Sequence, residues 1–162
     1  MKTKKLTLLA LLAAIALTIF MIEAQIPSPV PIPGVKLGLA NVITLVVLLR
    51  YRARDAVAVL LLRILLGSIF TGALVGMIYS LCGGLLCFAG MALLCRFLHR
   101  KHIWFISLIG AVLHNIGQML VAVLIAGKGM IFYLPFLMTA GCIAGAFTGL
   151  CAQLVLNRLG RQ

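Results

Sequence analysis

The chain has 162 residues, of which 64% are hydrophobic and 10% are charged, and its formal net charge is +12. Soluble domains carry about 25% charged residues, whereas this chain has two acids in total, Glu23 and Asp55. This composition excludes a water-soluble surface. It predicts an all-α polytopic membrane protein whose main solvent is the lipid bilayer.

Six apolar runs follow one another along the sequence and use nearly its whole length. A spanning helix needs about 20 apolar residues, so we expect a six-helix bundle that forms a single membrane domain over residues 1–162. The first run is long for the core of a cleaved signal peptide, so we expect it to be retained as a helix. The predicted spans are residues 6–23, 35–49, 55–70, 72–98, 103–126 and 130–156.

Alternate prolines separate the first two spans. Pro27, Pro29, Pro31 and Pro33 remove backbone donors and fix φ, so this segment is predicted to be an extended loop. It is the longest loop that the sequence predicts.

Basic residues gather at alternating ends of the spans. If the N-terminus is cytoplasmic, the outer segments hold two bases, Lys36 and Lys128, and Arg63 lies within a span. By the positive-inside rule, we expect a multi-pass protein of the cell membrane with both termini cytoplasmic. The bases do not alternate with aromatic residues, so no nucleic-acid partner is expected. The eleven bases on the predicted cytoplasmic side are Lys2, Lys4, Lys5, Arg50, Arg52, Arg54, Arg96, Arg100, Lys101, Arg158 and Arg161.

Small residues lie four apart in the first span, at Ala10 and Ala14. Such spacing lets helix backbones approach closely in lipid. The sequence leaves two readings open for this face, namely packing inside the bundle and docking of a second membrane protein.

Several polar residues fall inside the predicted spans, where an ionisable group costs about 2.5–3.5 kcal/mol. Arg63 lies about 12 Å from the inner face at the helical rise, and Asn41 and His114 lie at comparable depths. Glu23 and Lys36 flank the proline loop near the outer surface, with Glu23 well above Arg63. These positions predict a polar cavity that is open to the outside. The candidate ligand-binding residues are Arg63, His114, Asn115, Gln118, Asn41, Lys36 and Glu23.

Hydrogen bonds between helices are the alternative explanation for these groups. For Asn41 and Asn115 the sequence leaves both explanations open. For Arg63 we favour a ligand because the chain has so few acids to neutralise it. An anionic group on the ligand would complete the charge balance.

The sequence holds no recognisable catalytic constellation. It lacks paired carboxylates, an Asp-rich magnesium site, a Ser–His–acid set and a phosphate-binding Gly-rich loop. We therefore expect no catalytic residue, no metal site and no cofactor in this chain. A membrane-embedded binding subunit that takes its energy from partner proteins fits the residues best.

Two stretches resemble the Gx transporter family, which is also labelled heptaprenyl diphosphate synthase component I. One runs from Glu23-Ala24-Gln25-Ile26-Pro27 through Pro33 to Asn41, and the other is Leu113-His114-Asn115-Ile116-Gly117-Gln118. That family is in turn similar to the substrate-binding S components of energy-coupling factor (ECF) transporters.

The resemblance implies six helices, an outward-facing pocket covered by the first outer loop, and a small vitamin-like or prenyl-like ligand. It also implies a separate coupling protein and ATPases, and Ala10 and Ala14 match the alanines on which S components dock that protein. The synthase label implies a different role, as a non-catalytic membrane subunit for isoprenoid-quinone synthesis or for electron transfer at the cell surface.

Overall fold

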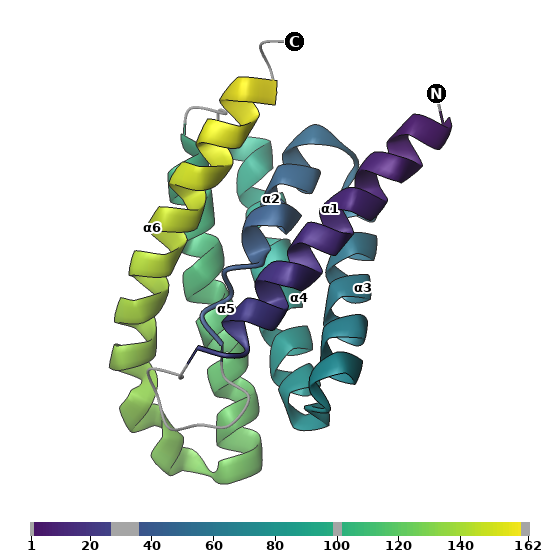
Figure 1. Ribbon diagram of the computed structural model, residues 1–162. Coiled ribbons are helices and arrows are strands. Elements are labelled where there is room, and N and C mark those ends of the chain that lie inside the picture. Colours follow the sequence, from purple (N-terminus) through teal and green to yellow (C-terminus); the bar gives the residue numbers. More distant parts are fainter. Residues whose placement is uncertain (1, 27–35, 99–101, 160–162) are drawn as a thin grey trace.

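The computed structural model describes residues 2–26, 36–98 and 102–159, so most of the proline-rich loop lies outside the described residues. Within these ranges the chain is helical and contains no strand (Figure 1), which confirms the predicted all-α bundle. Its elements are α1 (Lys2–Glu23), α2 (Asn41–Arg50), α3 (Ala53–Thr71), α4 (Leu74–Phe97), α5 (Ile103–Ala126), the 3-10 helix η2 (Lys128–Tyr133) and α6 (Leu134–Leu159).

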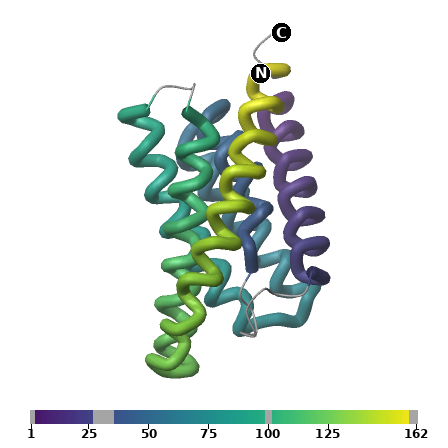
Figure 2. Tube along the Cα trace, turned by 90° about the vertical axis from the view of Figure 1, so that its left-hand side faces the viewer, coloured from purple at the N-terminus to yellow at the C-terminus, as the bar shows by residue number. Residues whose placement is uncertain are grey.

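The helices pack as two groups around α2. Helix α5 packs most extensively against α4 and α6, whereas α1 packs mainly against α3. Helix α2 contacts all five other α-helices, and both views show it inside the bundle (Figures 1 and 2). The two groups meet through the short α2 and through the direct packing of α3 against α4.

Four segments are long and apolar enough to cross a membrane: Thr3–Glu23, Leu74–Phe97, Ile103–Ala126 and Lys128–Arg158. These four segments make the chain a multi-pass membrane protein. Helix α3 is not among them: it has 19 residues but carries the charged residues Arg54, Asp55 and Arg63.

The predicted second span is wrong at its start, because α2 begins at Asn41 and not at residue 35. Gly38 has a φ of 81°, which is the left-handed region that interrupts a helix. Lys36–Ala40 instead forms a non-helical segment, which we call the strap. Helix α2 has 10 residues, about 15 Å of helix, which is half of a hydrocarbon core of about 30 Å.

The first residues of α1 and the last turns of α6 lie at the same end of the bundle (Figures 1 and 2). The turn between α2 and α3 lies at this end too, and there Lys5 Nζ donates a 2.7 Å hydrogen bond to Asp55 Oδ2. Asp55 Oδ2 also accepts from the backbone N–H of Arg52 at 3.0 Å and so caps α3. The assignment of this end to the cytoplasm remains a prediction from the positive-inside rule.

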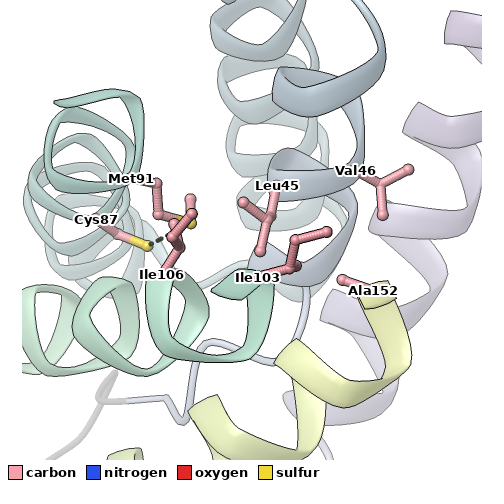
Figure 3. Close-up of a cluster of buried hydrophobic side chains, with 7 residues drawn as sticks. All are labelled: Leu45, Val46, Cys87, Met91, Ile103, Ile106 and Ala152. Atoms are coloured by element: carbon pink, nitrogen blue, oxygen red, sulfur yellow. Dashed lines mark hydrogen bonds between the residues drawn. The ribbon is translucent and has the colours of Figure 1, made fainter. Parts of the chain in front are cut away.

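Two apolar clusters lie toward opposite ends of the bundle. The cluster in Figure 3 joins α2, α4, α5 and α6 through Leu45, Val46, Cys87, Met91, Ile103, Ile106 and Ala152. The other cluster joins the start of α4, the end of α5 and the start of α6 through Tyr79, Met119, Val121, Ala122 and Leu137. The buried polar residues Asn41 and His114 occupy the level between these clusters in α2 and α5.

Glycines let α4 and α5 approach closely where the two helices cross. A Cβ added at Gly117 would lie 2.8 Å from the Cα of Gly83 and 2.9 Å from the carbonyl oxygen of Cys82. Both are backbone atoms, so a side chain at this position must push the helices apart.

We therefore expect Gly117→Ala to destabilise the bundle by about 1–3 kcal/mol, the usual cost of overpacking. Gly129→Ala is the matched control, because a Cβ there meets no atom within 4 Å. Thermal unfolding of both variants in one detergent measures the difference. Equal unfolding midpoints for Gly117→Ala and Gly129→Ala would show that the bundle does not depend on close packing of α4 and α5 at this crossing.

Candidate functional site

A hydrogen-bonded chain of three buried side chains crosses the middle of the bundle. Arg63 on α3 is 3% exposed, and its Nη2 donates to Asn41 Oδ1 at 3.0 Å. Asn41 Nδ2 lies 3.3 Å from His114 Nδ1 on α5. These hydrogen bonds connect α3, α2 and α5, and they hold the guanidinium in the interior of the bundle.

Three nitrogens of this cluster have no hydrogen-bond partner within the described residues: Arg63 Nε, His114 Nε2 and Gln118 Nε2. The Asn41 oxygen accepts from the guanidinium, and the His114 ring bonds both to Asn41 and to the backbone of Gly83. Arg63 Nε and Gln118 Nε2 are donors, and a buried donor without an acceptor is costly unless a further group satisfies it.

The strap covers this cluster and is held by two side chains. The Gly38 backbone N–H donates to Glu23 Oε1, and the Lys36 backbone N–H donates to Gln118 Oε1 at 3.4 Å. Non-helical backbone at membrane depth persists only where it is buried in protein and its polar groups are satisfied. Glu23 and Gln118 therefore stabilise the strap in its position.

The charged groups at the strap are Lys36, Glu23 and Arg63. Lys36 Nζ lies 3.5 Å from the centre of the Phe20 ring, and the Arg63 guanidinium carbon lies 5.8 Å from the same ring. Glu23 is the acid that interacts electrostatically with both Lys36 and Arg63. The two cations thus lie near one aromatic ring and one carboxylate.

The described residues leave little free space at the cluster. A cavity of about 10 Å³ is lined by Glu23, Lys36, Arg63 and His114, together with Phe20, Gly38 and Ser80. This is room for about one water molecule. The sequence predicted a cavity open to the outside, whereas in this conformation the strap lies over the cluster and the cavity beside it is small.

The structure brings together six of the seven predicted site residues. Glu23, Lys36, Arg63 and His114 line the cavity, Asn41 bonds to Arg63, and Gln118 bonds to the strap. The expected placement of Glu23 well above Arg63 is wrong, because both side chains turn inward to the same cavity.

Asn115 lies apart from this group. Its Nδ2 donates to the Leu137 carbonyl on α6 at 2.6 Å, and it does not line the cavity beneath the strap. The sequence left open whether Asn115 binds a ligand or forms a hydrogen bond between helices. In this structure it forms the hydrogen bond between helices.

Sequence reasoning missed Phe20, Gly38 and Ser80 as part of the site. Phe20 lies three residues before Glu23, so the helical repeat places both on one face, and this spacing was a usable signal. Gly38 becomes recognisable only through its backbone conformation, because a Cβ there would lie 2.9 Å from both Asn41 Nδ2 and His114 Cδ2. Ser80 carried no distinguishing signal.

The fold and the site define a multi-pass α-helical membrane protein with a cationic polar cluster buried in the middle of the bundle. Comparison with protein families identifies the chain more closely, with a match over residues 12–155 to heptaprenyl diphosphate synthase component I. The chain belongs to that family. Comparisons with curated proteins and with solved structures gave no match.

We expect Gly38→Ala to detach the strap from the cluster. Alanine at positive φ costs about 1–2 kcal/mol, and its Cβ would also collide with Asn41 and His114. The amides of residues 36–41 should exchange hydrogen faster, as measured by mass spectrometry in detergent.

Gly72→Ala is the control for backbone strain alone, because Gly72 has a φ of 66° and a Cβ there meets nothing within 4 Å. It should leave exchange at residues 36–41 unchanged. Unaltered exchange in Gly38→Ala would show that the strap is not held by this contact.

Proposed function

We propose that the chain is a membrane-embedded substrate-binding subunit, similar to an ECF transporter S component, that takes up a small anionic metabolite. The observation that carries this proposal is the buried guanidinium of Arg63, whose Nε has no acceptor among the described residues. Buried charges in proteins are normally paired. A ligand anion would supply the missing acceptor to Arg63 Nε and to the neighbouring donor Gln118 Nε2.

The local charge balance supports an anion. Arg63 and Lys36 carry two positive charges at the cavity, and Glu23 carries one negative charge when ionised. The Glu23 carboxylate also accepts from Gly38, so it is partly committed to the strap. The site then has an excess of one positive charge in a medium where uncompensated charge is costly.

The surface of α1 supports a partner in the membrane. Ala13 and Ala16 are buried against the bundle, whereas Ala10 and Ala14 are exposed. The small face that the sequence singled out is therefore available to a second helix. In this proposal it docks a transmembrane coupling protein, and separate ATPases energise uptake.

The proposal assigns no catalysis to this chain. Glu23 is the one acid at the cluster, and its carboxylate holds the strap. Asp55, the other acid of the chain, pairs with Lys5 at the basic end of the bundle. Neither acid is placed to act with the other.

The family description supports a second candidate function. Its name, heptaprenyl diphosphate synthase component I, fits a non-catalytic membrane subunit that assists isoprenoid-quinone synthesis. Surface electron transfer is a related role for such a subunit. Affinity capture of the full chain separates the candidates, because the first requires a coupling protein with ATPases, and the second requires a prenyl synthase or redox partner.

Arg63→Ala tests the binding role. Native mass spectrometry of the purified protein first identifies the retained small molecule. Loss of a charged hydrogen bond costs about 1.5–3 kcal/mol, so we expect the affinity for that molecule to fall about 10- to 100-fold. Arg63→Lys, which keeps the charge, should retain part of the affinity. If Arg63→Ala lowers folded yield as much as binding, Arg63 has a structural role only.

Ala14→Leu tests the partner role. The added side chain would project from the exposed face of α1 and hold a docking helix away, so capture of the coupling protein should fall at least about tenfold. Ala89→Leu, on the exposed side of α4, is the matched control and should capture the partner normally. Ligand retention should be the same in both variants. Undiminished capture by Ala14→Leu would remove α1 as the docking helix.

A further inference from the structure

A second cavity lies beside the first, on the other side of Gly38. It is also about 10 Å³ in volume, and its lining includes Leu37, Met91, Ala111 and Ala144 from the strap, α4, α5 and α6. Gly38 lines both cavities. Asn41 lines the second cavity and bonds to Arg63, which lines the first. Gly38 and Asn41 therefore stand between the two.

The two cavities differ in the chemistry that they offer. The first is lined by unpartnered nitrogens of Arg63 and His114. In the second, apolar side chains stand beside the hydroxyls of Ser107 and Thr148. These hydroxyls already bond to each other at 3.0 Å, and Thr148 also donates to the Ala144 carbonyl at 2.8 Å. The second cavity thus has no unpartnered hydroxyl and offers an apolar contact surface.

The strap between the cavities is non-helical. Glu23 and, at the long distance of 3.4 Å, Gln118 accept from its backbone amides, and its last three carbonyls accept from the first amides of α2. Displacement of Gly38 would uncover His114 Nε2, which lies 3.1 Å from the position of a Cβ on Gly38. The same displacement would join the two cavities.

We infer that the cavities are the two ends of one ligand site, and that the ligand is a small amphipathic monocarboxylate. Its carboxylate binds at Arg63 and His114, and its apolar part binds among Leu37, Met91 and Ala144. A monoanion matches the single excess positive charge left by Arg63, Lys36 and Glu23. This inference rests on the proposed binding function and specifies the class of its substrate.

The test uses the full chain in detergent with acetate, butanoate and hexanoate as probes and hexanamide as the uncharged control. Binding is measured by calorimetry against a detergent blank. Each added methylene that enters the apolar end should tighten binding about fourfold. Hexanamide should bind at least about tenfold more weakly than hexanoate, because it brings no charge to Arg63.

Variants at the apolar end distinguish this site from a simple anion site. Ala144→Leu fills the apolar end and should abolish the gain in affinity with the length of the acid, whereas Ala89→Leu, on an exposed face, should behave as the wild type. Leu37→Ala enlarges the apolar end, so the acid that binds most tightly should be a longer one than in the wild type. That variant keeps the inference testable if Ala144→Leu does not fold.

Equal affinities for acetate and hexanoate, or equal affinities for hexanoate and hexanamide, would overturn the inference. Absence of binding by the whole series would overturn it as well. In each case the capture of a coupling protein by α1 remains a separate test, so failure of the amphipathic site can be distinguished from failure of the proposed function.

Discussion

Burial of the Arg63 guanidinium is the constraint on which the centre of the molecule depends. A charged group at mid-depth in a bilayer must face the bundle interior and find hydrogen-bond partners there. Arg63 meets this demand by donating to Asn41, which is the first residue of α2. The start of α2 is thereby placed in the interior of the bundle, next to His114 of α5.

A short α2 creates a second demand, because the strap enters the bundle without helical hydrogen bonds. Its backbone amides need acceptors that lipid cannot provide. Glu23 and Gln118 supply them to Gly38 and Lys36. The Glu23 carboxylate that binds the strap is also the negative charge nearest to Lys36 and Arg63. Closure of the site and neutralisation of its charge are therefore coupled through one side chain, and a ligand anion would compete with Glu23 for the same cations.

Much of this arrangement can be predicted from the sequence, because a chain that crosses a bilayer needs long apolar helices and keeps its polar side chains inside the bundle. Apolar length predicted the helices, and the depths of Arg63, Asn41 and His114 placed them at one level. The spacing of His114 and Gln118 put both on one face of α5. Asn115 shows where such reasoning fails. It carries the same polar signal as His114, but adjacent residues point about 100° apart around a helix, so Asn115 faces Leu137 on α6. The left-handed backbone at Gly38 and the inward turn of Glu23 depend on tertiary contacts, which sequence spacing does not encode.

The small number of acids bears on what the family name means for this protein. Binding a diphosphate through magnesium uses several carboxylates as metal ligands, and the chain has two acids, of which one holds the strap and the other pairs with Lys5. The buried cluster is instead rich in donors, with unsatisfied nitrogens on Arg63, His114 and Gln118. Such a site favours an anion that arrives without its own metal, and its apolar neighbour favours one with a hydrophobic part. In a synthase complex, this chain would then hold an amphipathic molecule within the membrane, while a separate subunit would supply the carboxylates for the chemistry.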